Sequence, residues 1–352
     1  MMDLSKKKIA VLGTGANGAG IGADLVRAGL NVTFIDQWPD NVQAIRDSKL
    51  QVVLQETERF EVEVKTLHLC QVSELKENFD AVLLLVKAYD TKWACQLIEP
   101  YLAADGFIVG VQNGMTGQDI ADVVGPDRAL AAVIEVTSAM YEPGVVERHS
   151  GHDRSWFAVG PNNPEASRHV PMAAQLLELA GVVEQVEDIN SPKWMKLILN
   201  AAELVPSAIL DLSIVETTKF KDMKAVMLAA GDEAVAAAKF LDYKIRPIFG
   251  MSGMDAENPE TFVRTILDEL AANYILPHSR STVLQDWMKG RHSEVNELNG
   301  LVVKAFHSRN LVAPTNQAMV EFALAIERGE KTRGTHNYGP LLERIEELRV
   351  SN

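Results

Sequence analysis

The sequence contains little cysteine and no long apolar run, and each shortage excludes a class of protein. Only two of its 352 residues are cysteines, Cys70 and Cys95, so we expect neither a disulfide framework nor a cysteine-based metal site. No segment reaches the ~18 consecutive apolar residues of a membrane span. The opening residues, MMDLSKKK, lead into no apolar stretch of signal-peptide length. We therefore predict a cytoplasmic protein that has no membrane partner.

Positive charge is also in short supply. The chain carries 34 Lys and Arg against 48 Asp and Glu, a formal net charge of −14, which argues against a nucleic-acid partner. Its length suggests two domains, each able to bury a core of its own. We predict no metal site, because four histidines lack the spacing of metal ligands: His149, His152, His292 and His336.

The strongest motif lies in residues 8–36. An apolar run at 9–12 breaks at GTGANG (13–18), a helical pattern follows to residue 28, and a second apolar run at 32–35 ends on Asp36. Strand, glycine turn, helix, strand and acid is the order of a dinucleotide-binding fingerprint. The start of the helix offers N–H groups and a positive dipole end to phosphates. The predicted pyrophosphate-binding residues are Gly13, Gly15, Ala16, Asn17 and Gly18.

Each glycine of this motif has a separate expected task. Gly13 permits the tight turn, Gly15 lets the backbone approach the pyrophosphate, and Gly18 lets the helix pack closely against the strand.

Asp36 indicates which dinucleotide binds. Its carboxylate is placed to accept hydrogen bonds from the ribose hydroxyls of adenosine, whereas the 2′-phosphate of NADP would meet like charge. No arginine follows immediately, since the next residues are Gln37, Trp38 and Pro39. We predict NAD in preference to NADP, and a solvated aspartate at the end of a strand is the alternative.

Two more polar residues follow predicted buried strands. The run DAVLLLV (80–86) ends at Lys87, and the strand predicted at 106–111 leads into QNGM, which contains Asn113. Open α/β sheets bind ligands at the carboxyl ends of their strands. We predict Lys87 to contact the cofactor and Asn113 to contact the nicotinamide ribose or a substrate. Alternatively, Lys87 marks where its strand reaches water, and Asn113 belongs to an ordinary turn.

From residue 190 to the end the pattern is helical, with breaks predicted near Pro206, 247–259, Pro277 and Pro314. We therefore predict a dinucleotide-binding domain at 1–189 and a helical domain at 190–352. Lys196 and Asn200 lie four residues apart and share one helix face among apolar neighbours. The pattern alone leaves open that the lysine extends to water and the asparagine satisfies a backbone group.

The chain resembles the ketopantoate reductase (2-dehydropantoate 2-reductase) family from end to end. The resemblance rests on the glycine fingerprint and on VKAYD (86–90), QNGM (112–115), KWMKLILN (193–200), TVLQDWMKGRHSEVNELNG (282–300) and the Pro314 and Asn316 pair. It implies an α/β fold class: an N-terminal Rossmann-type domain followed by an all-helical domain like that of 6-phosphogluconate dehydrogenase. It also implies a homodimer.

The resemblance further implies roles for single residues. Lys196 matches the catalytic lysine of the family's KWxKLxxN motif, and Asn200 a substrate contact one turn later. Glu294 matches the acid that binds substrate and positions the lysine. Thr282 stands where members usually have a serine that bonds the substrate carboxylate. Lys87 and Asn113 match the cofactor-side lysine and the asparagine of the NGM loop.

Two positions depart from the family pattern. Leu204 stands where many members have a further substrate-binding asparagine, which puts the usual substrate in question. Asp36 replaces the basic character found after the second strand in most members, which take NADPH. The region 243–280 contains a loop rich in Met, Gly and Pro, which either reshapes the pocket or forms a surface connection.

The sequence therefore predicts an NAD(P)-dependent oxidoreductase. It would move a hydride between nicotinamide and the carbonyl or hydroxyl carbon of a small carboxylate, a 2-oxo or 2-hydroxy acid, with Lys196 as general acid or base. Two alternatives remain: an NAD-dependent dehydrogenase of a different hydroxy acid or secondary alcohol, and a dinucleotide-sensing protein without turnover.

Overall fold

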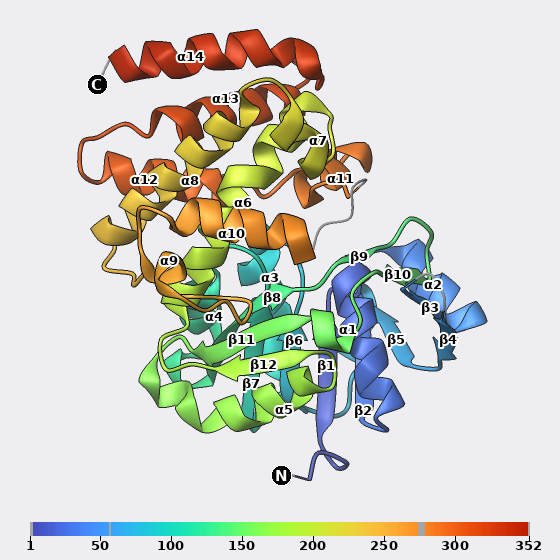
Figure 1. The fold of residues 1–352 in the computed structure, drawn as a ribbon. Helices are drawn as coiled ribbons and strands as arrows, with labels where there is room; N and C mark the ends of the chain where they lie inside the picture. Colours follow the sequence, from blue (N-terminus) through green and yellow to red (C-terminus); the bar gives the residue numbers. More distant parts are fainter. Residues whose placement is uncertain (1–2, 56–57, 274–278, 351–352) are drawn as a thin grey trace. The chain divides into compact units, whose positions relative to one another are not determined.

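A computed structural model describes residues 3–55, 58–273 and 279–350 of the chain. The chain divides into two compact units, Met1–Asn190 and Ser191–Asn352, which we call the N-terminal and C-terminal units. The first is built on a parallel-dominated sheet with helices, and the second consists of helices (Figure 1). The predicted fold class is thus confirmed.

The N-terminal unit contains the described strands and five α-helices. The strands are β1 (Lys8–Leu12), β2 (Asn31–Asp36), β3 (Leu50–Leu54), β4 (Glu58–Val62), β5 (Lys65–His68), β6 (Phe79–Leu84), β7 (Leu102–Val111), β8 (Ala129–Glu135), β9 (Ser138–Ala139), β10 (Val145–Arg148), β11 (Trp156–Pro161) and β12 (Val182–Gln185). The helices are α1 (Ala16–Arg27), α2 (Pro39–Ser48), α3 (Thr91–Ile98), α4 (Gly117–Val124) and α5 (Val170–Glu178).

The main sheet has the strand order β12-β11-β8-β7-β6-β1-β2-β5. Its neighbours pair in parallel, apart from the antiparallel pair β8 and β11. In β1, Ile9 and Val11 join the apolar core that contains α1 and α5, while Ala10 and Leu12 join the core that contains α3 and α4. Helices therefore cover both faces, which explains why the central strands are continuous apolar runs.

The strand order reverses at β1. From β1 the chain builds β2 and β5 on one side, and then β6, β7 and β8 on the other. In open α/β sheets a ligand binds at the carboxyl ends of the strands beside such a reversal. The loops that follow β1, β6 and β7 meet this condition.

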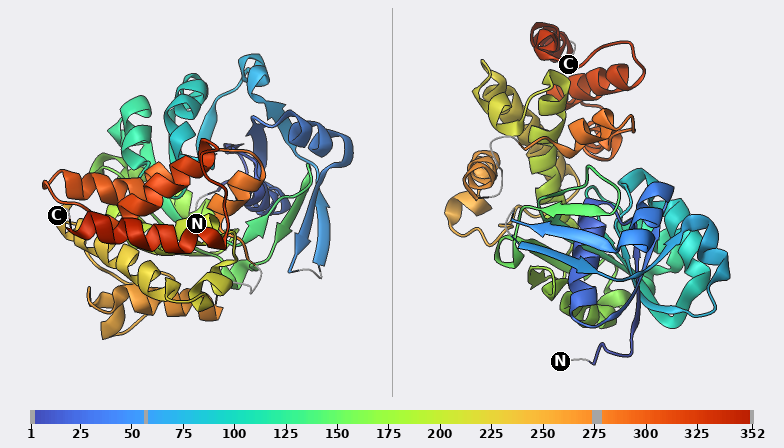
Figure 2. Two further views of the ribbon diagram at one scale, coloured as in Figure 1. Left: turned by 90° about the horizontal axis from the view of Figure 1, so that it is seen from above. Right: turned by 90° about the vertical axis from the view of Figure 1, so that its right-hand side faces the viewer.

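A second, four-stranded sheet, β4-β3-β10-β9, lies beside α1 and α2 (Figures 1 and 2). The strands β3 and β4 belong to this sheet and not to the main one. The short strand β5 supplies the edge of the main sheet, and the sequence analysis did not predict it.

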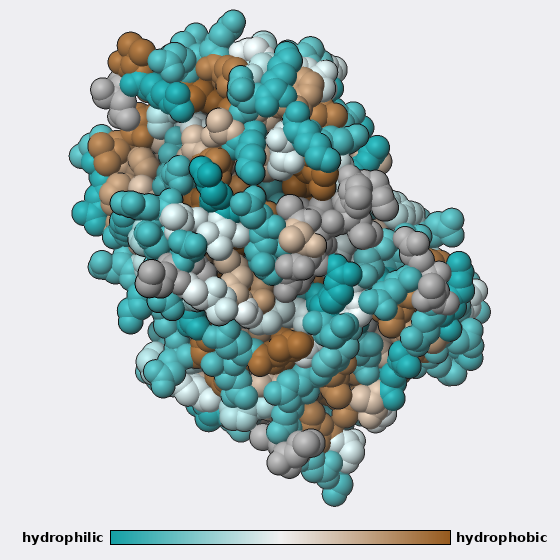
Figure 3. All heavy atoms as spheres, viewed as in Figure 1, coloured by the Kyte–Doolittle hydropathy of each residue, from teal (hydrophilic) through white to brown (hydrophobic). Residues whose placement is uncertain are grey.

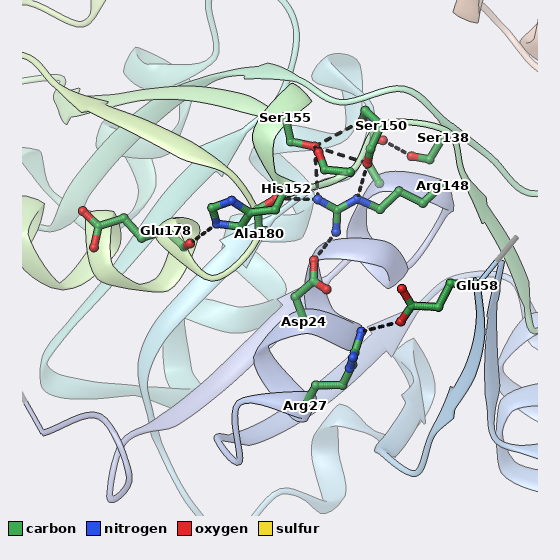
Figure 4. A network of polar contacts seen from close by, with 12 residues as sticks. Asp24, Arg27, Glu58, Ser138, Arg148, Ser150, His152, Ser155, Glu178 and Ala180 are labelled. Atoms are coloured by element: carbon green, nitrogen blue, oxygen red, sulfur yellow. Dashed lines mark hydrogen bonds and ion pairs between the residues drawn. The ribbon is translucent and has the colours of Figure 1, made fainter. Parts of the chain in front are cut away.

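Arg148, at the end of β10, joins this small sheet to α1. Its guanidinium is 4 % exposed and forms an ion pair with Asp24 of α1. It also donates to Ser150 O (3.0 Å), to Ser155 Oγ (3.1 Å) and to Ala180 O (Figure 4). One buried cation thereby holds α1 against three other segments of the N-terminal unit.

The C-terminal unit is organised around its longest helix, α6. The helices are α6 (Asn190–Leu210), α7 (Ile214–Lys219), α8 (Met223–Phe240), α9 (Met254–Glu257), α10 (Phe262–Asn273), α11 (Thr282–Met288), α12 (Asn299–His307), α13 (Pro314–Glu327) and α14 (Tyr338–Val350). Nearly every side chain of α6 is buried. Its second half shares an apolar core with α8, α11, α13 and α14, the last two of which lie side by side (Figure 2).

The predicted helix break at Pro206 is wrong. Proline removes a backbone donor and usually ends or kinks a helix, at a cost of about 3 kcal/mol. Here α6 continues through Pro206, because Leu204, Val205, Ala208 and Ile209 are all packed in the core on either side of it. Helix α13 begins at Pro314, where a helix break was predicted. The break predicted at Pro277 lies outside the described residues.

Polar residues cover most of the face seen in Figure 3, and apolar residues appear there as scattered patches. Within the described parts of the chain, no helix combines the length and apolar character that a membrane crossing requires.

Candidate active site

The glycine turn after β1 has the geometry of a dinucleotide loop. Gly13 has a φ of +94°, and a Cβ added there would lie 2.7 Å from the backbone of Leu85 and Val86. A Cβ on Gly18 would lie 2.0 Å from the carbonyl oxygen of Gly13, so both positions require glycine. A Cβ on Gly15 would meet nothing within 4 Å, so the backbone there is open to a ligand.

Helix α1 begins directly at this open backbone. Its N-cap residue is Gly15, which offers no side-chain cap, and its first turn carries no acidic residue. Uncapped N–H groups and the positive end of the helix dipole suit a phosphate. Asn17, in the first turn, accepts a hydrogen bond from Ser138 Oγ of β9. The turn and the helix start therefore fit the pyrophosphate of a dinucleotide.

Asp36 at the end of β2 is 5 % exposed, so it is not a solvated aspartate. Its Oδ2 accepts from Thr14 N (2.7 Å) and Thr14 Oγ1 (2.6 Å), and its Oδ1 accepts from Trp38 N (2.8 Å). The carboxylate thus fixes the glycine turn to β2. Its negative charge stays at the carboxyl edge of the sheet, where the sequence analysis placed the adenosine ribose.

Loops after β6 and β7 reach the same edge. Leu85 N donates to Leu12 O (2.8 Å), and Gln112 Nε2 donates to Val86 O (2.8 Å). Because β6 ends at Leu84, Lys87 lies beyond the strand, at the N-cap of a short 3₁₀ helix. Lys87 and Asn113 are both half-buried. The structure thus brings the loops carrying Gly13, Lys87 and Asn113 to one edge of the sheet.

In the C-terminal unit, Lys196 and Asn200 lie on one face of α6. Asn200 is 2 % exposed and Lys196 is half-buried. Trp194 anchors this part of the helix by donating from Nε1 to Ala234 O of α8 (2.9 Å). The Lys196 ammonium lies 5.1 Å from the centroid of the Phe249 ring.

The segments that carry Thr282 and Glu294 are both tied to the middle of α6. Ser281, the N-cap of α11 next to Thr282, donates from Oγ to Leu204 O (2.9 Å). Asn299, at the start of α12, donates from Nδ2 to Ala201 O (3.0 Å). Thr282 is half-buried, and Glu294 is 4 % exposed. These bonds hold both segments beside the helix turn that follows Asn200.

Glu327 positions the residue before Glu294. Its Oε1 accepts from Ser293 N (2.8 Å), Ser293 Oγ (2.6 Å) and Trp287 Nε1 (2.9 Å). These bonds outweigh burial and hold the pKa of the Glu327 carboxyl below its usual value.

Glu327 also borders a cavity of about 450 Å³ at the end of α6 remote from Lys196. Charged residues that line this cavity pair with one another: Arg333 forms an ion pair with Asp211 (3.4 Å).

The sequence analysis missed two buried charged residues of α6. Lys193 is 3 % exposed and Glu203 is 4 % exposed. Burial lowers the pKa of Lys193 to about 7, against the opposing effect of the Glu294 carboxylate. Their spacing could have revealed them, because residues 193, 196, 200 and 203 recur at intervals of three and four and therefore share one helix face.

Asn316, part of the pair that supported the resemblance, has a structural role. It is fully buried, and its Nδ2 donates to Glu233 Oε2 (2.7 Å) and to Ala230 O (2.9 Å) of α8. Its Oδ1 accepts from Asn299 Nδ2 of α12 (2.9 Å). Pro314 occupies the first turn of α13. The pair therefore joins three helices.

Among the described residues, no group of three or more His, Cys, Asp or Glu side chains is arranged to hold a metal ion.

The reversal at β1, the glycine turn and the uncapped α1 define the class: an oxidoreductase fold with a nicotinamide-dinucleotide-binding unit followed by a helical unit. The chain belongs to the ketopantoate reductase family. The family model "Ketopantoate reductase PanE/ApbA" matches residues 9–162, and the corresponding C-terminal model matches residues 188–327.

Individual relatives agree with this assignment. The 2-dehydropantoate 2-reductase of Pyrococcus abyssi is 25 % identical over 312 residues, covering 88 % of this chain and 94 % of the relative. That of Archaeoglobus fulgidus is 24 % identical, covering 92 % and 99 %.

Solved structures show the same fold. A PanE/ApbA family ketopantoate reductase from Ralstonia eutropha JMP134 has a TM-score of 0.77 at 28 % identity, with 92 % of this chain and 99 % of that chain covered. A D-mandelate dehydrogenase, solved with NADH and anilino(oxo)acetate, has a TM-score of 0.80 at 20 % identity, covering 92 % and 98 %.

Proposed function

We propose that this protein is an NAD-dependent oxidoreductase of the 2-dehydropantoate 2-reductase type. It reduces ketopantoate or a related small 2-oxo acid, or oxidises the matching 2-hydroxy acid, with Lys196 as the general acid or base. The main support is the face of α6 that presents Lys196 and the buried Asn200. Segments bearing Thr282 and Glu294 are tied beside it through Leu204 O and Ala201 O. The amine, the amide and the hydroxyl match the carbonyl and carboxylate oxygens of an oxo acid, and the Glu294 carboxylate suits the lysine or a substrate hydroxyl.

Charge develops on the carbonyl oxygen when the carbonyl carbon is reduced, and the side chains of α6 suit that oxygen. The Lys196 ammonium stabilises the charge and donates the proton, and the Asn200 amide shares the stabilisation. Glu294 orients the lysine or a substrate hydroxyl, and the Thr282 hydroxyl and the Asn113 amide bind the substrate carboxylate. In oxidation, neutral Lys196 accepts the proton of the alcohol. A nicotinamide dinucleotide, when bound, supplies or accepts the hydride.

The proposed preference for NAD rests on Asp36. Its carboxylate is fixed at the end of β2 by three donated hydrogen bonds, from Thr14 N, Thr14 Oγ1 and Trp38 N. That carboxylate accepts a ribose hydroxyl and disfavours a 2′-phosphate. The glycine turn, together with Ala16, Asn17 and Lys87, supports the rest of the dinucleotide in this proposal.

A second candidate function is a dehydrogenase of a different hydroxy acid or a secondary alcohol. It is favoured by Leu204, a buried apolar residue where many family members have a substrate-binding asparagine. The D-mandelate dehydrogenase of the same fold shows that the scaffold also exists in an enzyme named for an aromatic hydroxy acid.

Steady-state kinetics with both cofactors would separate these functions. The purified protein is given ketopantoate, pyruvate, phenylglyoxylate and other 2-oxo acids, and loss of NADH or NADPH absorbance is followed. Saturable turnover of ketopantoate with NADH supports the first function, whereas turnover of another oxo acid alone supports the second. Cofactor binding with no turnover on any substrate would contradict both and favour a sensing protein.

We also propose that the chain acts as a homodimer, on the basis of the resemblance alone, and in the cytoplasm, as the sequence pattern predicts. Sedimentation equilibrium of the purified protein checks the dimer, which a single monomeric species would contradict.

A further inference from the structure

The loop at residues 243–253 packs along the start of α6. Lys244 N donates to Ser191 Oγ (3.0 Å), and the rings of Tyr243 and Trp194 lie 5.3 Å apart. Further along the loop, Ile248 and Phe249 are 1 % and 6 % exposed. Residues 243–249 of the region rich in Met, Gly and Pro therefore pack against α6, whereas Gly250, Ser252 and Gly253 are exposed.

Phe249 adopts a backbone conformation that its side chain disfavours. Its φ is +61°, and Gly250 follows with a φ of +71°. A bulky residue in the left-handed region is uncommon and costs of order 1–3 kcal/mol, so it persists only where its surroundings require it. Met251 N donates to Ile248 O (3.0 Å) across this turn. The turn aims the phenyl ring at α6.

The ring meets the proposed catalytic lysine. Lys196 Nζ lies 5.1 Å from the ring centroid, inside the ~6 Å range in which the negative face of an aromatic ring attracts a cation. The contact attracts the ammonium and restricts its direction, which serves a group that must donate a proton to a carbonyl oxygen.

We propose that Phe249 is a positioning residue that acts through Lys196, and that residues 243–249 of the loop form a wall of the Lys196 site. This inference rests on the proposed function, in which Lys196 is the general acid. The ring attracts the ammonium and holds it in one direction, and the strained turn at Phe249 places that ring.

Other charged groups lie on the elements that contact this part of α6, and the experiment must leave them unchanged. They are Lys193 and Glu203 of α6, Asp232 and Glu233 of α8, Tyr243, Lys244 and Arg246 of the loop, and Glu294 before α12. Phe249→Leu keeps an apolar side chain and removes the aromatic face, and Phe249→Tyr keeps that face.

A direct test titrates Lys196 without turnover. Lysines are labelled by reductive ¹³C-methylation, and the Lys196 resonance is identified by its loss in Lys196→Arg. Phe249→Leu should lower the titration midpoint of that resonance by about 0.5–1 pH unit, the equivalent of one cation–π contact. Phe249→Tyr should restore it. An unchanged midpoint in Phe249→Leu would overturn the proposal.

Kinetics supply the second readout. In the reductive direction the alkaline limb of the pH–rate profile should move to lower pH by the same amount in Phe249→Leu, with kcat reduced about fivefold and KM within twofold. The matched control is Phe322→Leu, because Phe322 is also buried in this unit and lies 4.6 Å from a lysine ammonium, Lys331. The control should leave the alkaline limb in place. A limb that moves equally in both variants would indicate a general loss of packing and refute the proposal.

The two proposals fail separately. If Lys196→Met abolishes turnover while Phe249→Leu shifts neither the resonance nor the limb, the role of Phe249 is wrong and the proposed function stands. If Lys196→Met keeps full activity, the proposed function fails, although the titration would still show the ring acting on the amine. Phe249→Gly offers a further check, since it removes the ring while glycine accepts the positive φ. It should reproduce the shift of Phe249→Leu.

Discussion

A single carboxylate, that of Asp36, links the glycine turn to β2. The sequence placed this acid at the end of a strand and predicted a role in ribose recognition. The structure adds three hydrogen bonds, from Thr14 N, Thr14 Oγ1 and Trp38 N. Sequence spacing did not reveal these partners, because they depend on how the turn folds back over the strand. At the scale of the residue, then, one carboxylate braces the turn, and in the proposed function it also discriminates between the two cofactors.

Replacing Asp36 by Asn should alter cofactor preference. Asparagine keeps a similar shape and one acceptor oxygen but removes the charge that opposes a 2′-phosphate. We expect the kcat/KM ratio of NADPH over NADH to rise about tenfold, the equivalent of about 1.4 kcal/mol of lost repulsion. Initial rates with both cofactors measure it. Asp40→Asn, a matched loss of an exposed charge on α2, should leave the ratio unchanged. An unaltered ratio in Asp36→Asn would show that Asp36 only supports the turn.

Lys193 should make the stability of the protein depend on pH. Its folded-state pKa of about 7 lies below the value of 10.5 for an ordinary lysine. Between these values the unfolded chain binds a proton that the folded chain does not, so stability should rise with pH, by at most about 1.4 kcal/mol per unit. Below pH 7 this contribution to the slope vanishes.

Urea denaturation of Lys193→Met between pH 7 and 9.5 tests this prediction. The variant should lose the upward slope that wild type shows. Lys224→Met, which removes an exposed lysine, should keep it. Identical slopes for wild type and Lys193→Met would mean that Lys193 is charged in the folded state.

At the scale of the element, α1 and α6 show where sequence patterns succeed and where they fail. The glycine fingerprint and the α1 that follows it were predictable, because Gly13 and Gly18 occupy positions that only glycine tolerates. The continuation of α6 through Pro206 was not, since tertiary packing on both sides of the proline overrides its local preference. The small sheet was not predicted either, because β3 pairs with β10, which lies about 90 residues later in the chain.

Arg148 should be essential for holding α1 against the small sheet. Arg148→Met removes the main cation beside the half-buried Asp24 carboxylate, and this should cost about 2–3 kcal/mol, less than the 3–5 kcal/mol typical of a fully buried pair. Urea denaturation measures the loss. Arg168→Met, which breaks exposed ion pairs, should cost less than about 1 kcal/mol. If Arg148→Met also lost less than about 1 kcal/mol of unfolding free energy, the role of this ion pair would be refuted.

The stability deficit of Arg148→Met should depend on pH. Burial raises the pKa of Asp24, and Arg148 opposes that rise. Without Arg148 the folded state binds a proton at Asp24 more readily than the unfolded state, so the deficit should shrink as pH falls from 7 toward 4. Adding Asp24→Asn to Arg148→Met should recover about 2 kcal/mol at pH 7. A deficit independent of pH would contradict this explanation.

At the scale of the whole molecule, the family membership and the order of a dinucleotide-fold unit before a helical unit were accessible from sequence motifs. Two family models cover residues 9–162 and 188–327, one for each unit. The motifs did not predict the contact of Phe249 with Lys196, because it joins residues 53 positions apart through a strained turn. They also could not supply Glu327, which fixes the segment before Glu294 from the far end of α13.

The central claim is that Lys196 performs the proton transfer of a dinucleotide-dependent reduction, and one paired measurement tests it. For Lys196→Met, kcat/KM on the best 2-oxo acid and the Kd of NADH by fluorescence titration are determined beside wild type and Lys224→Met. In Lys196→Met we expect kcat/KM to fall about 10³-fold, in the range of general acid catalysis, while the Kd of NADH stays within twofold of wild type. Activity of Lys196→Met within tenfold of wild type would contradict it.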